Sequence, residues 1–425
     1  MKPYAEMTAE ELTQELEKLK KEYKKVQAMD IQLNMSRGIP CIDQLDLSMH
    51  MMDVLDSSSD LTCEDGTDCR NYGQLTGIEE ARELLGDMME NNPKDIIIYG
   101  NSSLNVMFDT ISRVWTHGVM GNTPWCRQPE VKFLCPVPGY DRHFGITGYY
   151  GFEMILVPMS EDGPDMDMVE ELVKDESVKG IWCVPKYSNP QGVTYSDETV
   201  RRLANLKPAA KDFRIMWDNA YCVHDISDTP DELLNIYDEC VKAGNEDLPL
   251  LFCSTSKITF PGAGVAAMAA SPANMKVLRE RYNFEVISYD KLNMLRHVKY
   301  FGDYNGVLQH MKKHKAVLAP KFGIVLSTLK NELAPVGVGK WTDPNGGYFV
   351  SIDVMNGTAK RVVQLCREAG LVLTGAGATY PNGFDPNDSN IRIAPSFPPN
   401  DELQTAMDLF CVCVKLAACE KLLNK

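Results

Sequence analysis

The feature that most constrains this chain is a series of short apolar segments between residues 96 and 268, separated by stretches of helical character. Continuous apolar runs are typical of strands covered on both faces, as in parallel sheets flanked by helices. We therefore expect an α/β fold, with a three-layer α/β/α large domain around a mainly parallel sheet. The segments that predict buried strands are 96–99, 131–134, 154–157, 180–184, 214–217, 250–253 and 265–268.

The chain differs in character on either side of this region. Residues 8–28 predict an exposed helix that begins with a capping-box pattern, Thr8 followed by Glu11. After about residue 285, a long helical stretch runs to about residue 333, and a last helix is predicted near 400–423. Together with an alternating run that begins at Tyr348, these segments predict a smaller α+β domain.

A length of 425 residues is more than one ordinary core accommodates and favours two domains. We predict that residues 1–49 contribute a helix and a segment to the small domain. Residues 50–315 are predicted to form the large domain, and residues 316–425 the C-terminal small domain.

Composition excludes several classes of protein. A formal net charge of −16 repels phosphate backbones, so nucleic-acid binding is not expected. No apolar run approaches the roughly 20 residues that span a bilayer, and the polar N-terminus is unlike a signal peptide. The 13 cysteines are scattered without a CxxC pair, which indicates reduced thiols and a cytoplasmic protein.

His310 and His314 have the i,i+4 spacing of a helical metal site. Lysines at 312, 313 and 315 surround them, so we interpret the pair as a solvated helix face and expect no metal.

Polar clusters follow five of the predicted strands. Ligands of such sheets bind at the carboxyl ends of the strands, so these clusters are candidate site residues. The clusters are Asn101-Ser102-Ser103, Pro138-Gly139-Tyr140, Ser188-Asn189-Pro190-Gln191-Gly192, Asp218-Asn219-Ala220-Tyr221 and Ser254-Thr255-Ser256-Lys257.

Each cluster taken alone has a second interpretation. Residues 101–103 open a helix and suit a phosphate, but they also suit an ordinary N-cap. Tyr140 can stack on a flat ring or simply pack, and Asn189 belongs to a turn signal. Asp218 after a buried strand needs a partner such as a protonated ring nitrogen, or it caps a turn. Lys257 is either a loop lysine or a nucleophile with a depressed pKa. Together, the five clusters fit one ligand, pyridoxal phosphate (PLP).

In this order the motifs resemble those of fold-type I PLP-dependent aminotransferases of class I/II, and are most similar to the MocR-like, type Ic aspartate aminotransferase branch. The resemblance covers roughly residues 30–425, and Asp-x-Ala-Tyr followed by Ser-x-Ser-Lys is its most specific part. The motifs are Tyr72-x4-Gly77, Pro138-x-Tyr140, Asn189-Pro190-x-Gly192, Asp218-x-Ala220-Tyr221, Ser254-x-Ser256-Lys257, Gly346-Gly347-Tyr348-Phe349 and Asn390-Ile391-Arg392.

The resemblance implies a role for each matching residue. Lys257 would hold PLP as a Schiff base and carry the proton from the substrate. Asp218 would pair with the ring nitrogen, while Tyr221 and Asn189 would bond to the phenolic oxygen. Tyr140 would stack on the ring.

The resemblance also implies contacts with phosphate and substrate. Tyr72 would reach the phosphate of the other subunit, which implies a homodimer with shared sites. Arg392 would clamp the substrate carboxylate, and Gly38 would lie near the substrate. The residues that would cradle the phosphate within the subunit are Asn101, Ser102, Ser103, Ser254 and Ser256.

One position departs from the family pattern. Relatives usually carry an arginine for the phosphate seven or eight residues after the lysine, where this chain has Gly264. The cation for a distal substrate carboxylate is also unassigned. Arg296 is the first candidate, ahead of Lys299, Arg37 and Arg142, and a surface salt bridge is the alternative for each.

The resemblance implies an aminotransferase that passes an amino group between amino acids and 2-oxo acids by a ping-pong mechanism. Aspartate with 2-oxoglutarate is the favoured pair, because of the branch. Three alternatives stay open: a PLP-dependent lyase, a non-catalytic MocR-like sensor domain, and a degenerate relative with a scaffold role.

Overall fold

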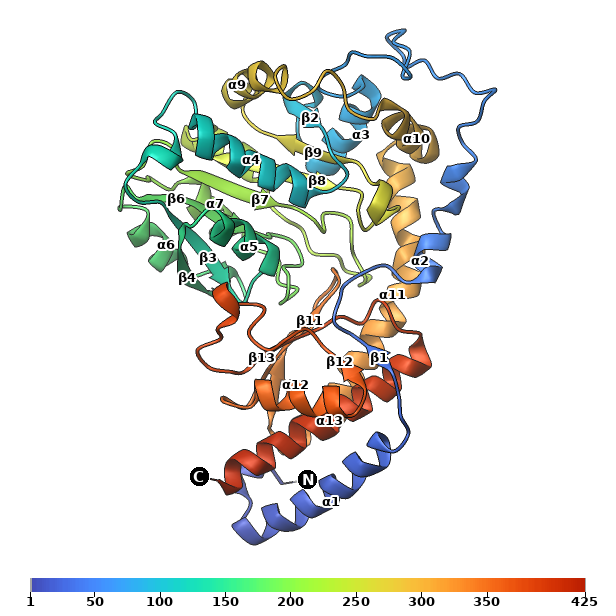
Figure 1. The fold of residues 1–425 in the computed structure, drawn as a ribbon, viewed down its shortest axis with the longest axis vertical. Coiled ribbons are helices and arrows are strands. Elements are labelled where there is room, and N and C mark those ends of the chain that lie inside the picture. Colours follow the sequence, from blue (N-terminus) through green and yellow to red (C-terminus); the bar gives the residue numbers. More distant parts are fainter. Residues whose placement is uncertain (1, 425) are drawn as a thin grey trace.

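The computed structural model describes residues 2–424, and its large sheet occupies the upper body in Figure 1. The strand order is β2-β9-β8-β7-β6-β3-β4-β5. The bounds are β2 Ile96–Ile98, β3 Lys132–Val137, β4 Glu153–Ser160, β5 Gly163–Pro164, β6 Val178–Cys183, β7 Arg214–Asp218, β8 Pro249–Ser254 and β9 Ala266–Ala269. All seven predicted strands are present.

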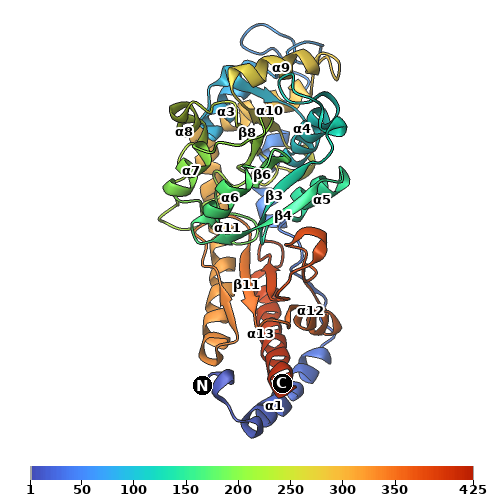
Figure 2. The ribbon, with the colours of Figure 1, turned by 90° about the vertical axis from the view of Figure 1, so that its left-hand side faces the viewer.

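Helices cover both faces of this sheet, because alternate strand residues point into two separate apolar cores. Trp182 and Met216 belong to the core on one face, whereas Ile181 and Ile215 belong to the other. Figure 2 shows α4 and α5 on one side and α6, α7 and α8 on the other. The predicted three-layer α/β/α architecture is confirmed. The helices are α3 Glu79–Met89, α4 Ser103–His117, α5 Asp141–Tyr149, α6 Met166–Leu172, α7 Asp197–Ala204, α8 Ile236–Ala243, α9 Pro272–Tyr282 and α10 Lys291–Phe301.

The direction of β9 determines where the clusters meet. The strands β4, β3, β6, β7 and β8 are parallel, whereas β9 is antiparallel to both β8 and β2. Two reversals give β2 the same direction as β8. The segment after β2 therefore reaches the same edge of the sheet as the segment after β8.

The lower body in Figure 1 is built around a small antiparallel sheet, β10-β11-β13, and a third apolar core. The N-terminal helix α1 lies along the C-terminal helix α13 (Figure 1). A capping box of Thr8 and Glu11 starts α1, as predicted. The bounds are α1 Ala9–Gln27, β1 Leu33–Asn34, α2 Ile42–Asp46, α11 Tyr304–Glu332, β10 Gly339–Trp341, β11 Val350–Val354, α12 Ala359–Glu368, β12 Leu371–Val372, β13 Asn390–Ile393 and α13 Asn400–Leu423.

The long helical stretch after residue 285 is two helices instead of one. Gly302, with φ 75°, ends α10, and Asp303 caps the start of α11. The proposed domain boundary at 315/316 falls within α11. We retain that division as a proposal, because Val307 and Met311 pack in a core of the large sheet, whereas Leu318 and Phe322 pack in the third core.

The interpretation of His310 and His314 as a solvated helix face is wrong. Both are buried, with 4% and 1% of their surface exposed, and their Nε2 atoms lie 3.0 Å apart. The lysines at 312, 313 and 315 point elsewhere on α11, because a helix places successive residues about 100° apart. Within residues 2–424, no group of three or more His, Cys, Asp or Glu side chains is arranged to hold a metal. In that same part of the chain, no helix has the length and apolar character needed to cross a bilayer.

Candidate active site

Lys257 lies in the turn that follows β8 and points across the edge of the sheet. Its Nζ is 5.0 Å from the centroid of the Tyr221 ring and 6.0 Å from that of Tyr348. Burial lowers the pKa of the Lys257 amine, Asp218 opposes this effect, and the positive Arg392 adds to it. The local field thus favours the neutral, nucleophilic form of the amine.

Asp218 is the last residue of β7 and is 2% exposed. His143 Nε2 donates to its Oδ2 at 3.1 Å, and the His143 ring stacks on Trp182 with 4.4 Å between centroids. The other carboxylate oxygen, Oδ1, is buried and has no hydrogen-bond partner within residues 2–424. Because a buried carboxylate oxygen is costly to leave unpaired, this atom is a ready acceptor for a protonated ligand nitrogen.

His143 is the residue that sequence reasoning missed. A signal was available, since His143 comes three residues after Tyr140, one helical turn into the segment that follows β3. Residues three apart share a helix face, so both side chains can turn toward the same site. In the structure the two rings contact edge to face, with 5.0 Å between centroids.

Arg392 reaches the same place from the small sheet. It lies on β13, and its Nη1 donates to Asn189 Oδ1 at 3.1 Å and to Asp141 Oδ1 at 3.2 Å. Its guanidinium carbon lies 4.7 Å from the centroid of Phe349. Among the residues that the structure describes, Arg392 Nε is buried without an acceptor. The guanidinium thus keeps a donor for a ligand, while Asp141 of α5 and Asn189 of the segment after β6 hold it in place.

Gly38 packs directly on Phe349. A Cβ at position 38 would lie 2.4 Å from Phe349 Cζ, so only glycine lets the N-terminal segment pass this close. The Phe349 ring also contacts the Arg392 guanidinium, so a single side chain separates Gly38 from Arg392.

The predicted phosphate residues converge from two strands. Ser256 Oγ donates to the Asn101 carbonyl at 3.1 Å, and Ser254 Oγ donates to Ser256 Oγ at 3.0 Å. Ser102 is the N-cap of α4, whose side chain accepts from Asn105, and Ser103 is its first residue. Backbone N–H groups at the start of a helix suit a phosphate group.

The structure gives a reason for glycine at position 264. A Cβ there would lie 2.7 Å from the Asn101 carbonyl oxygen and 3.4 Å from the Ser256 amide nitrogen. The loop that carries Asn101 packs directly on this position, so there is no room for an arginine side chain pointing that way. Sequence reasoning identified the departure but could not supply this packing.

The fold of the single subunit does not place Tyr72 or the four candidate cations beside Lys257. The Tyr72 side chain is 74% exposed on the subunit surface. Arg296 lies on α10 next to His297, whose ring contacts Thr255 and Thr259 behind Lys257. Within residues 2–424, Arg296 makes no hydrogen bond or ion pair. Lys299, Arg37 and Arg142 are solvent-exposed.

A buried polar network supports Lys257 from behind. Tyr348 donates to the Lys257 carbonyl at 3.4 Å and accepts from Gln44 Nε2 at 2.8 Å. The Gln44 amide also lies 3.1 Å from His314, which contacts His310. Sequence reasoning assigned none of these side chains to the site, because they come from segments far apart in the chain.

The residues present fit PLP. A carboxylate oxygen without a partner among residues 2–424, an amine with a lowered pKa and a hydroxyl-rich helix start are the acceptor, nucleophile and anion cradle that a phosphorylated pyridine aldehyde requires. This combination at the carboxyl edge of a mainly parallel sheet defines a PLP-dependent enzyme of fold type I.

Comparisons with known proteins assign the chain to one family within this class of enzymes. The aspartate amino-transferase family matches residues 7–425. The aspartate aminotransferase of Corynebacterium glutamicum is 47% identical over 412 residues, covering 96% of this chain and 94% of that protein. A crystal structure of an aspartate transaminase from C. glutamicum superimposes with a TM-score of 0.95, at 46% identity and 98% coverage of both chains.

A more distant structure shares the fold alone. Pyrococcus horikoshii kynurenine aminotransferase, solved in complex with PMP, has a TM-score of 0.74 at 19% identity, with 94% of each chain covered. The chain belongs to the aspartate aminotransferase family. It is an aminotransferase, and its cofactor is pyridoxal 5′-phosphate. The MocR-like branch within this family stays a prediction.

Proposed function

We propose that this enzyme transfers the amino group of aspartate to 2-oxoglutarate by a ping-pong mechanism through Lys257. The observation that supports this most directly is the convergence of Lys257, Asp218 and Arg392, which come from both sheets. The C. glutamicum relative named aspartate aminotransferase supports the choice of amino acid.

The residues of the large sheet hold the cofactor and move the proton. When bound, PLP supplies a ring that accepts the electrons released at the substrate Cα. Lys257 Nζ would hold the aldehyde of the cofactor and would take the Cα proton of the substrate. Asp218 Oδ1 would accept from the ring nitrogen, and the His143 bond keeps the carboxylate oriented. Burial raises the pKa of Tyr221, so its hydroxyl stays protonated and would donate to the phenolic oxygen of the cofactor, beside Asn189.

The remaining cofactor contacts follow from the same placement. Tyr140 lies at the start of α5 against His143 and would stack on the cofactor ring. Hydroxyls and backbone amides would bind the phosphate in place of an arginine at position 264. These phosphate residues are Asn101, Ser102, Ser103, Ser254 and Ser256.

Arg392 orients the substrate through its α-carboxylate. Its planar fork can bind both carboxylate oxygens, a geometry that lysine cannot copy. Gly38 leaves the N-terminal segment close to this position. For the distal carboxylate we keep Arg296 as first candidate, followed by Lys299, Arg37 and Arg142. Within residues 2–424, none of these four side chains forms a hydrogen bond or an ion pair, so each cationic group is available to a substrate.

We also propose a homodimer in which Tyr72 completes the partner's phosphate site. Large apolar side chains on the N-terminal segment are exposed in the single subunit, as Tyr72 is, and a partner would cover them. They are Ile39, Ile42, Met49 and Met52. A cytoplasmic location stays part of the proposal, supported by 13 cysteines that are all unpaired in the structure.

A half-reaction tests the proposed chemistry. The holoenzyme is mixed with aspartate alone, and the cofactor spectrum and the products are followed. Conversion of the cofactor to its amine form with release of oxaloacetate, reversed by 2-oxoglutarate, is the expected result. Release of pyruvate and ammonia would instead show a lyase and overturn the transaminase proposal.

Lys257→Ala tests the assignment of the amine. We expect turnover to fall by about 10⁴-fold, the upper end of what general acid–base catalysis contributes. Lys276→Ala, which removes an exposed lysine on α9, is the matched control and should retain full activity. Covalent attachment of the cofactor and normal turnover in Lys257→Ala would overturn the assignment.

A further inference from the structure

A small cavity far from Lys257 is lined by three arginines. It lies between α4, α9 and the first residues of β7 and β8, with a volume of about 30 Å³. Asp and Glu are absent from the described residues that line it, although the chain as a whole carries a net charge of −16. The polar lining residues are Thr110, Arg113, Arg214, Asn274 and Arg281.

Arg214 is the most deeply buried of these cations. It is 2% exposed, and no carboxylate within residues 2–424 lies within 4.0 Å of its guanidinium. Nη1 donates to the Phe213 carbonyl at 2.6 Å, and Nη2 faces Asn274 Oδ1 at 3.5 Å. Arg214 Nε is buried and has no acceptor in the described part of the chain. Since arginine stays charged in proteins, a guanidinium buried in this way needs an anion nearby.

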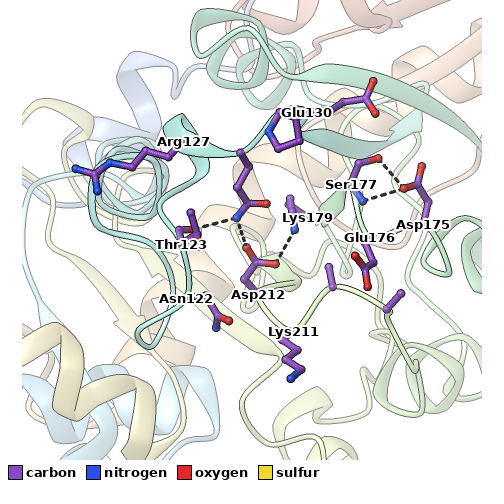
Figure 3. Close-up of a pocket in the computed structure, with 14 residues that line it drawn as sticks. Asn122, Thr123, Arg127, Glu130, Asp175, Glu176, Ser177, Lys179, Lys211 and Asp212 are labelled. Atoms are coloured by element: carbon purple, nitrogen blue, oxygen red, sulfur yellow. Dashed lines mark hydrogen bonds and ion pairs between the residues drawn. The ribbon is translucent and has the colours of Figure 1, made fainter.

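The two nearest acidic residues are already engaged. Figure 3 shows the Asp212 carboxylate bonded to Lys179. Lys179 Nζ lies 2.8 Å from Asp212 Oδ1, and Asp212 Oδ2 accepts from Gln128 Nε2 and Trp125 Nε1. The Asp247 carboxylate accepts from Ser271 Oγ and, at 3.5 Å, from the Asn274 side-chain amide, whose oxygen faces Arg214. Both carboxylates act on Arg214 only at longer range.

Arg281 and Arg113 add positive charge on the α4 and α9 side. Arg281 donates to the carbonyls of Gly118 and His117 and forms no ion pair within the described chain. Burial lowers the pKa of Arg281, and the positive charge of Arg113 adds to this effect. Arg113 is paired with Asp109 and Glu285 and stacks over Tyr282. Two of the three guanidiniums therefore lack a carboxylate.

We propose that this cavity binds a small inorganic anion of the size of chloride. A volume of about 30 Å³ accommodates one or two water-sized particles, so phosphate and organic acids are too large. Arg214 begins β7, whereas Asp218 ends it, so the cavity lies at the opposite edge of the sheet from Lys257. The anion would neutralise Arg214 and stabilise the junction of α4 and α9 with the sheet.

Stability against chloride concentration is the first test. The thermal midpoint of the PLP-loaded enzyme is measured in increasing sodium chloride, with sodium gluconate keeping the ionic strength constant. Above the dissociation constant we expect a rise of about 1–2 °C for each tenfold increase in chloride. Equal midpoints in chloride and gluconate would overturn the proposal.

Variants locate the effect. Arg214→Met keeps an unbranched apolar stem but removes the charged guanidinium, and it should abolish the dependence on chloride. Lys276→Met removes one exposed positive charge from α9 and should retain it. Arg392→Gln should also retain it, which separates this cavity from anion binding at the proposed active site. Loss of the dependence in Arg392→Gln alone would refute the assignment to the cavity.

A crystallographic measurement works even if Arg214→Met fails to fold. Wild-type crystals are soaked in sodium bromide, and anomalous scattering is measured at the bromine edge. A peak within hydrogen-bond distance of Arg214 supports the proposal, and water at that position with no anomalous signal overturns it.

Discussion

At the scale of single residues, the chemistry depends on how neighbours change the properties of Lys257. A lysine in a polar loop is ordinarily protonated, and only burial together with nearby charge makes it a nucleophile. Asp218 and Arg392 act on it with opposite signs, because one is negative and the other positive. Replacing each neighbour by a neutral residue should therefore shift the Lys257 pKa in opposite directions.

We predict that the apoenzyme captures PLP with a pH dependence governed by Lys257. The rate should rise with pH and be half-maximal below the ordinary lysine pKa of about 10.4, because the neutral amine reacts. Asp218→Asn should move this midpoint to lower pH and Arg392→Gln to higher pH. Stopped-flow absorbance gives the rates. Shifts in the same direction for both variants would contradict the description.

Gly264→Ala tests the packing of the phosphate loop. The new Cβ meets the Asn101 carbonyl at 2.7 Å, so the loop must move away from Ser256. We expect the dissociation constant for PLP to rise by about tenfold, or about 1.4 kcal/mol. Gly262→Ala is the matched control from the same loop, because nothing lies within 4 Å of a Cβ there. Equilibrium titration of the apoenzymes measures both, and equal affinities would refute the packing argument.

At the scale of elements, sequence patterns predicted best those structures that depend on residues close together in the chain. The predicted strands, the capping box of α1 and the last helix all appear in the structure. The break between α10 and α11 was missed, because Gly302 alone does not outweigh the helical pattern around it. The mainly parallel sheet was predicted, but the antiparallel direction of β9 was not, since it depends on how β9 pairs with β8 and β2.

Thr8→Ala should destabilise the packing of α1 along α13. Thr8 Oγ1 accepts from the Glu11 amide at 3.2 Å, and Glu11 accepts from the Thr8 amide at 2.7 Å. Loss of such a cap costs about 0.5–2 kcal/mol in free energy of unfolding. Thr13→Ala, in the exposed middle of α1, is the control and should be neutral or stabilising. Denaturant unfolding followed by circular dichroism measures both; similar losses would argue against a capping role.

At the scale of the whole molecule, buried histidines behind Lys257 join segments that are distant in the sequence. His314 on α11 contacts His310 and Gln44 of α2, and Gln44 donates to Tyr348 in the segment that precedes β11. His297 on α10 contacts Thr255 and Thr259. Burial lowers the pKa of both His297 and His314 to about 4. The fold therefore keeps these rings neutral well below the pH at which an exposed histidine gains a proton.

The free energy of unfolding should consequently fall as the pH decreases from about 6.5 to about 4. Over this range the unfolded chain binds protons that the folded rings exclude, so stability increases with pH. His297→Gln should make this dependence less steep, whereas His50→Gln, at an exposed position, should not. Denaturant midpoints at several pH values measure the slopes. An unchanged slope in His297→Gln would contradict the argument.

The sequence by itself determined the order of the elements, the class of the fold and the residues of the cofactor clusters. Apolar periodicity and strand-end chemistry are local properties, and they can be read along the chain. Only the tertiary structure placed His143 on Asp218, positioned Arg392 against Asn189, and showed why Gly264 cannot be larger. It also buried His314 where the lysines around it predicted a solvated face. These features depend on contacts between segments far apart in the sequence, and such contacts exist only once the two sheets have packed together.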